Sequence, residues 1–183
     1  DGTLTRDGTY TGNEPNASDP GGSDTNVSVT TLDDLKDAIA QATAGTQMDI
    51  HISADLDISE DLEFGGNAWY YVDSGCTLTV KSGVTLTVSA YAGILGTLLV
   101  EQGAGLVNQG QIYADNPDSR LVMEGTYTHE GILIASTDTV TGIPASQITH
   151  TVTVTTEAAL LEAAAITGYQ EVNILIFGSS ITL

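Results

Sequence analysis

The chain has few cysteines and few basic residues, and each shortage excludes certain classes of protein. A single cysteine among 183 residues excludes an intrachain disulfide framework and a cysteine-based zinc site. Only 4 Lys and Arg stand against 24 Asp and Glu, which gives a formal charge of -20. Nucleic acid is therefore not an expected partner, because binding to phosphates requires a basic surface. No apolar run reaches the length of a membrane span, so we expect no membrane insertion either.

The rest of the composition fits a folded protein that works outside the cell. Hydrophobic residues make up 41% of the chain, which is enough for a buried core. The length suits one domain, with room for the start of another. Thr, Ser, Gly, Ala and Val are abundant. An acidic, threonine-rich chain with so little lysine and cysteine predicts an extracellular or cell-surface protein of a bacterium.

Residues 1–26 differ in composition from the rest of the chain. They are rich in Gly, Asp, Asn, Ser, Thr and Pro and contain few apolar residues. Such a segment buries too little surface to offset the entropy lost on ordering. We therefore expect a flexible acidic arm or linker, with the alternative of an extended arm that pairs with a free strand edge.

A strand–helix–strand pattern begins after this segment. Val27 and Val29 alternate as in a strand, and apolar residues then follow helical spacing over residues 31–44. Gly45 ends the helix, and alternation returns in residues 48–52. The same pattern recurs about 124 residues later. The matching pairs are Val27 with Val152, Val29 with Val154, Thr31 with Thr156, Leu35 with Leu160, Gly45 with Gly168, Ile50 with Ile174 and Ile52 with Ile176.

A finer repeat of about 20 to 23 residues lies between the two copies. Residues 77–83, 97–103 and 121–125 align with one another, as do residues 108–114 and 129–135. Short strands separated by glycine-containing corners are typical of a parallel β-solenoid, in which inward Leu, Val and Ile form continuous ladders. The alternative, an antiparallel sandwich, is disfavoured because the hairpin dipeptide Asp-Gly occurs only within the first segment.

These repeats predict a mainly β fold, a parallel β-solenoid (β-helix) with short capping α-helices. Residues 27–150 form the helix-capped solenoid, and the first helix covers the open end of the first coil. Thr31 and Asp34 form a capping pattern at the start of that helix. Residues 151–183 form a second cap helix and a strand pair, which either covers the far end or begins a second solenoid. No further coil follows the last strand in this sequence, so we expect either that the sequence is part of a longer protein or that this strand pairs with another subunit.

This arrangement resembles bacterial extracellular parallel β-helix proteins, namely the pectate-lyase-like superfamily and the solenoid modules of surface adhesins. The resemblance covers about residues 27–136 and rests on the helical segment VTTLDDLKDAIAQA and the coils TLTVKSGVTLTV, GTLLVEQGAGLVNQG and GTYTHEGILIA. These patterns describe coil geometry. The resemblance therefore implies a fold and an extracellular location, and it carries over no catalytic residues.

Two surface clusters are candidate binding sites. Trp69 and Tyr70 belong to the main aromatic cluster, and an exposed aromatic platform can hold sugar rings, although alternation sends part of this cluster into the core. Asp49, Asp55 and Asp57 project outward from neighbouring strands and offer the hard oxygen ligands that calcium prefers. A solvated acidic face is the alternative to calcium, and no other cofactor is expected.

The sequence contains no recognisable catalytic motif, so we do not expect an enzyme. A polysaccharide lyase of this fold would need a base, and Arg120 in the polar segment 114–120 is the best candidate. We expect instead a non-catalytic structural or adhesive surface module. Its terminal strands would join copies of itself, or neighbouring surface domains, into a head-to-tail filament. A carbohydrate-binding module that recognises a polysaccharide is the alternative, and the lyase ranks third.

Overall fold

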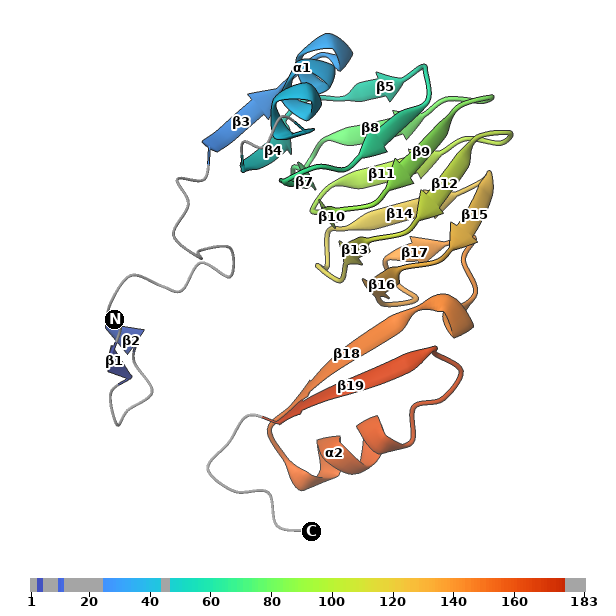
Figure 1. The fold of residues 1–183 in the computed structure, drawn as a ribbon. Helices are drawn as coiled ribbons and strands as arrows, with labels where there is room; N and C mark the ends of the chain where they lie inside the picture. The colour runs from blue at the N-terminus through green and yellow to red at the C-terminus, as the bar shows by residue number, and fades with distance from the viewer. Residues whose placement is uncertain (1–2, 5–9, 12–24, 44–46, 177–183) are drawn as a thin grey trace.

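The computed structural model describes residues 3–4, 10–11, 25–43 and 47–176, and in it the chain winds into a parallel β-solenoid (Figure 1). Three all-parallel sheets in this part of the chain form the sides of the coil, which confirms the predicted fold class. Most of the expected arm over 1–26 lies outside the described residues. Its described parts are the start of β3 and an antiparallel strand pair, β1 (Thr3–Leu4) and β2 (Tyr10–Thr11).

The largest sheet, called sheet I here, runs from one end of the solenoid to the other. All of its neighbouring strands are parallel. In spatial order its strands are β19 (Glu171–Ile176), β18 (Thr149–Val154), β16 (Ile132–Ala135), β13 (Gln111–Ala114), β10 (Tyr91–Ile94), β7 (Ala68–Val72), β4 (Met48–Ile52) and β3 (Thr25–Val29).

Two smaller parallel sheets close the coil. Sheet II contains β17 (Val140–Thr141), β14 (Arg120–Met123), β11 (Thr97–Val100), β8 (Thr77–Val80) and β5 (Leu56–Ile58). Sheet III contains β15 (Thr126–His129), β12 (Gly105–Asn108), β9 (Thr85–Val88) and β6 (Leu62–Phe64).

Equivalent residues stack from coil to coil and fill the interior. Leu78 in β8 is in register with Leu98 in β11, and Leu98 with Leu121 in β14, so the three leucines form a buried ladder. Successive side chains of a strand point to opposite faces, which explains the alternation of buried and half-buried residues. β13 also pairs with β16 in the register that the sequence alignment predicts.

Helix α1 (Leu32–Thr43) covers the first coil, as predicted. The Thr31 hydroxyl accepts a hydrogen bond from the backbone N–H of Asp34 at 3.2 Å, which caps the start of the helix. Leu35, Ala38 and Ala42 are buried in the core cluster of the solenoid. The helix therefore shields the apolar end of the first coil from water.

Short elements close the far end and lead into a second strand–helix–strand unit. A 3-10 helix, η1 (Ala145–Gln147), lies between Ile143 and Ile148, which are both buried in the core. The unit then follows as β18, α2 (Glu157–Ala164) and β19, and the Thr156 hydroxyl caps α2 by accepting the N–H of Ala159 at 3.2 Å. Neither α1 nor α2 is long and apolar enough to cross a membrane.

Candidate functional site

The two predicted sugar-binding residues lie on opposite faces of β7. Trp69 projects from the outer face of sheet I and is half-buried, whereas Tyr70 is in the core with 1% of its surface exposed. The Tyr70 ring stacks on Phe64 with centroids 4.3 Å apart, and its hydroxyl donates a hydrogen bond to the Gly65 carbonyl at 2.7 Å. Strand alternation turns the Tyr70 side chain inward, so of the two predicted residues only Trp69 lies on the outer face.

Other aromatic residues lie beside Trp69 on the outer face of sheet I. The ring centroids of Trp69 and Tyr91 are 5.3 Å apart, those of Tyr71 and Tyr91 are 5.9 Å apart, and those of His51 and Tyr71 are 4.8 Å apart. These rings come from neighbouring strands β4, β7 and β10 (Figure 1). With Tyr113 of β13 they form a half-buried surface, called the aromatic face below, that consists of His51, Trp69, Tyr71, Tyr91 and Tyr113.

Gly93 in β10 makes room for this row of rings. It is in register with Tyr71 on one side and with Tyr113 on the other. A Cβ atom at position 93 would lie 2.9 Å from Tyr71 Cδ1 and 3.3 Å from Tyr91 Cε1, so the first contact is too short and the second is tight. The glycine therefore allows the rings of Tyr71 and Tyr91 to lie over β10.

Sequence reasoning missed most of the aromatic face, although the sequence contained a signal. The register places Tyr91 beside Trp69 and Tyr113 beside Gly93. Extending the coil alignment from residues 108–114 back to YAGI at residues 91–94 would have placed these tyrosines in neighbouring coils. Aromatic residues on one outward face of successive coils are thus the pattern to search for.

Carboxylates border the aromatic face on its β4 side. Asp49 is the register neighbour of Trp69. Asp73 follows β7, and its Oδ1 atom lies 2.9 Å from Nδ1 of His51 in a hydrogen bond. This end of the aromatic face is therefore both ring-rich and acidic.

A further carboxylate lies at the β13 side of the aromatic face. Burial raises the pKa of Asp115, and His150 partly offsets this effect. Burial is also the main reason that the pKa values of Tyr91 and Tyr113 are raised from the ordinary 10.0. Both phenols therefore stay neutral hydrogen-bond donors at pH 7 and above.

The three aspartates of the predicted calcium site do not come together. Asp49 lies on sheet I, whereas Asp55 and Asp57 lie at β5 of sheet II, because the chain turns a corner of the solenoid between β4 and β5. Asp57 Oδ2 lies 3.9 Å from Nζ of Lys81. Among the described residues, no three His, Cys, Asp or Glu side chains are grouped so that they could hold a metal ion. The three aspartates therefore do not form one site in the described part of the chain, and calcium binding stays a prediction.

Two aspartates complete the backbone hydrogen bonding of the first coil. Asp55 Oδ1 accepts the backbone N–H of Thr77 at 2.8 Å, and Asp61 Oδ1 accepts that of Thr85 at 2.8 Å. Thr77 and Thr85 begin the strands of the next coil, β8 and β9. In the following coil a backbone carbonyl accepts the equivalent N–H of Thr97. The carboxylates thus satisfy donors that would otherwise lack an acceptor.

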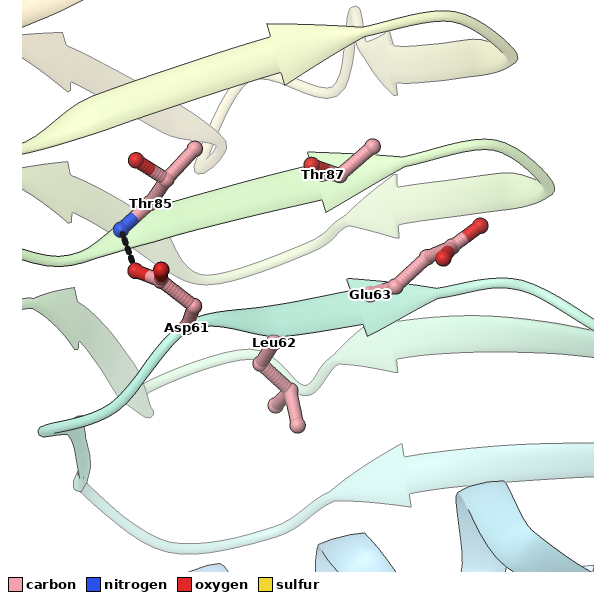
Figure 2. A pocket seen from close by; sticks show the side chains of 5 residues that line it. All are labelled: Asp61, Leu62, Glu63, Thr85 and Thr87. Atoms are coloured by element: carbon pink, nitrogen blue, oxygen red, sulfur yellow. Dashed lines mark hydrogen bonds between the residues drawn. The ribbon is translucent and has the colours of Figure 1, made fainter.

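A shallow hollow on sheet III contains the second of these contacts. Figure 2 shows Asp61 bonded to the backbone of Thr85, with Leu62 projecting to the other side of β6. Glu63 Oε1 accepts a hydrogen bond from the Ser89 hydroxyl at 2.5 Å. Both carboxylates therefore bond the first coil to the second. The residues that line the hollow are Asp61, Leu62, Glu63, Thr85 and Thr87.

Arg120, the candidate base of a lyase, is bonded to its own loop. Its Nη1 atom donates hydrogen bonds to the carbonyl oxygens of Pro117 at 2.8 Å and Ser119 at 2.6 Å. The residue is exposed at the start of β14. Both bonds therefore lie within the polar segment 114–120.

A chain of polar side chains joins the last coils to the second unit, and sequence reasoning did not find it. Asn108 Nδ2 donates a hydrogen bond to the Tyr127 hydroxyl at 3.2 Å. The same hydroxyl lies 3.1 Å from Nδ1 of His129. The other ring nitrogen of His129, Nε2, lies 2.8 Å from Oε1 of Gln170. Asn108 and His129 are in register with Val88, an inward residue of β9. Polar residues in an apolar ladder were therefore the available signal.

The two ends of sheet I carry the same unit in the same register. Val27 pairs with Ile50 and Val29 with Ile52 at one end, and Val152 pairs with Ile174 and Val154 with Ile176 at the other. Ile52 has 0% of its surface exposed, whereas the equivalent Ile176 is 55% exposed. Among the described residues, β19 has a strand partner on one edge only. Within the part of the chain that the structure describes, sheet I thus ends in an apolar strand edge at β19.

The fold and these surfaces define the described part of the chain as a parallel β-solenoid with an aromatic outer face and a strand edge at β19 that pairs with none of its other strands. Comparison with family models, with curated proteins and with solved structures gives no significant match for the chain. Its function is therefore inferred from the molecule itself.

Proposed function

We propose that the chain is a non-catalytic structural or adhesive module that associates head to tail through the end strands of sheet I. The observation that carries this proposal is the 55% exposure of Ile176, against 0% for Ile52 at the equivalent position of the first unit. In the first unit, the coil that follows β4 covers Ile52. The second unit presents the equivalent apolar strand, and no strand of residues 47–176 pairs with its outer edge.

The opposite end of sheet I offers a matching partner. β3 has a strand neighbour on one side only among the described residues, and it runs parallel to β19 through the sheet. Open strand edges pair readily with strands of other chains. Pairing of β19 with β3 of a second copy would continue the sheet. Because such a contact uses two different surfaces, it leads to an open filament unless it closes into a ring.

An extracellular or bacterial cell-surface location and kinship with the pectate-lyase-like superfamily and with adhesin modules are part of the proposal. They are supported by the stacked parallel coils and by an acidic, lysine-poor composition with a formal charge of -20. The expected partners are copies of this chain or neighbouring surface domains.

The double variant Leu175→Lys/Ile176→Lys tests the open edge. Both residues are exposed, by 46% and 55%, so lysine is tolerated in the free molecule but places two charges in the proposed contact. Ile132→Lys is the matched control, because Ile132 is 49% exposed on the side of the solenoid. Sedimentation velocity at increasing concentration, with electron microscopy of the same samples, measures the association.

We expect the unmodified chain and Ile132→Lys to form head-to-tail oligomers or filaments, and the double variant to stay monomeric with an unchanged melting temperature. Association of the double variant at the level of the unmodified chain would contradict the proposal. A monomeric unmodified chain over the whole concentration range would contradict it as well.

A further inference from the structure

We infer that the aromatic face binds a linear polysaccharide of neutral or amino sugars. The aromatic face lies on the side of the solenoid, over β4, β7, β10 and β13, and not at its ends. The inference adds a ligand to the adhesive role proposed above, and it does not depend on head-to-tail association.

The stacking of coils turns single aromatic residues into a row. Strands of neighbouring coils lie about 4.8 Å apart, so rings in register follow one another along the solenoid. The centroid distance between Trp69 and Tyr91 is 5.3 Å, and Tyr71 continues the row to His51 at 4.8 Å. A row that extends over several coils fits a chain-shaped ligand better than a compact one.

The chemistry of the rings fits sugars. A pyranose ring has an apolar face of C–H groups and a rim of hydroxyls, and tryptophan and tyrosine likewise combine an apolar ring with a polar edge. The Tyr91 and Tyr113 phenols are neutral near pH 7, as tyrosines ordinarily are, and burial raises their pKa values further. They can therefore donate hydrogen bonds to sugar oxygens while their rings pack against the sugar face.

The aromatic residues are concentrated on this one side of the solenoid. Outward positions of sheets II and III, as far as the structure describes them, hold mainly aliphatic or β-branched residues such as Thr79, Thr87 and Val107. Threonine in these places is explained by its preference for strands. Packing in the core does not explain the tyrosines and the tryptophan gathered on one outer face, because core residues would be fully buried and these are only half-buried.

The negative charge of the molecule favours neutral and amino sugars over acidic ones. Asp49, Asp73 and Asp115 border the aromatic face, and the whole chain carries a formal charge of -20. Acidic polysaccharides are repelled by this field. Neutral sugars can donate their hydroxyls to the carboxylates, and the ammonium group of an amino sugar is attracted both by carboxylates and by aromatic rings.

The chain contains its own reporter for this site. Trp69 is the single tryptophan of the sequence, so intrinsic tryptophan fluorescence measures the aromatic face directly. We would titrate the full chain with cellohexaose, chitohexaose, the deacetylated glucosamine hexamer and hexagalacturonate, and with oligolysine as a basic peptide. We expect a saturable change with neutral or amino-sugar oligomers and none with hexagalacturonate.

Variants that keep Trp69 identify the contributing residues. Tyr91→Ala removes the ring beside Trp69, and we expect binding to weaken about tenfold. Gly93→Val keeps every ring but displaces those of Tyr71 and Tyr91, so it should weaken binding to a similar degree. Leu99→Ala, an outward half-buried residue of sheet II in the same coil, is the matched control and should bind as the unmodified chain does.

Three results would overturn the inference. One is the absence of a fluorescence change with every neutral and amino-sugar oligomer. Another is an equal affinity for Tyr91→Ala and the unmodified chain, with melting temperatures confirming that both are folded. The third is saturation by oligolysine alone, which would assign the aromatic face to a basic protein segment.

Discussion

Tyr70 is the largest fully buried side chain of the solenoid, and its ionisation makes stability depend on pH in alkaline solution. Burial raises its pKa from the ordinary 10.0 to about 12, and the hydrogen bond to Gly65 opposes this only in part. The unfolded chain loses the phenol proton near pH 10, whereas the folded chain keeps it until about pH 12. The free energy of unfolding therefore falls as the pH rises from 10 to 12, and the ionisation of Tyr70 lowers it by about 3 kcal/mol over this range.

Tyr70→Phe separates this effect from the ionisation of the other tyrosines. We expect the variant to be about 1 kcal/mol less stable at pH 7, because the Gly65 carbonyl loses its hydrogen bond. Between pH 10 and 12 its stability should fall less than that of the unmodified chain. Urea unfolding at a series of pH values measures both, with Tyr71→Phe on the outer face as control. Equal pH slopes for Tyr70→Phe and Tyr71→Phe would show that Tyr70 does not carry the effect.

Single residues were predictable where strand alternation alone decides their position. Alternation predicts that part of the cluster 69–71 is buried, and Tyr70 confirms it. The neighbours of Trp69 were not predictable in this way, because Tyr91 comes from the next coil and is placed beside Trp69 only by the register of sheet I. A surface that several coils build together therefore requires knowledge of how the coils align.

The corner between sheets III and I depends on a stack of small residues. A Cβ atom on Gly131 would lie 2.1 Å from the carbonyl oxygen of Gly110, and one on Gly110 would lie 2.1 Å from that of Ala90. Backbone atoms cannot move aside as a side chain can. We therefore expect Gly131→Ala to separate the last coils locally and to lower the free energy of unfolding by about 3 kcal/mol.

Gly83→Ala is the comparison for this corner glycine. Gly83 also lies at a corner, but no neighbouring atom is within 4 Å of its added Cβ, and its φ is +84°. The loss should then be about 1 to 2 kcal/mol, the cost of a left-handed backbone for alanine. The urea concentrations at the midpoints of unfolding compare the stabilities of the two variants, provided that both have the same dependence of the free energy of unfolding on urea concentration. A loss for Gly131→Ala no larger than that for Gly83→Ala would contradict the proposed close packing.

The regular elements were predictable because the same constraints return in every coil. Leucine ladders and corner glycines repeat, and the aligned Gly110 and Gly131 do stack as the alignment predicts. The corner between β4 and β5 was not predictable, because alternation continues across it in the sequence while the chain changes sheets. This corner places Asp49 and Asp55 on different sheets, and for that reason the three aspartates are not grouped together.

The whole molecule combines a strong negative charge with an apolar edge. The repeated strand–helix–strand unit was predictable, since the paired valines and isoleucines of both copies already match in the sequence. The difference between the copies was not, because the exposure of Ile176 depends on what packs beyond β19. Attraction at this edge is local, whereas repulsion between two chains of charge -20 acts over the Debye length.

Association should therefore strengthen with ionic strength. At about 0.02 M NaCl the repulsion extends over roughly 20 Å, and at about 0.5 M it is confined to a few ångströms, while the apolar contact at β19 is little affected by salt. We expect the association constant from sedimentation velocity to rise steadily between these two concentrations. At equal ionic strength, CaCl2 and MgCl2 should strengthen association to the same extent as each other. The reason is that the described residues include no group of three metal-ligating side chains that could favour one ion. Stronger association in CaCl2 than in MgCl2 would reveal a specific calcium contact and would contradict this electrostatic account. Weaker association at about 0.5 M NaCl than at about 0.02 M NaCl would contradict it as well.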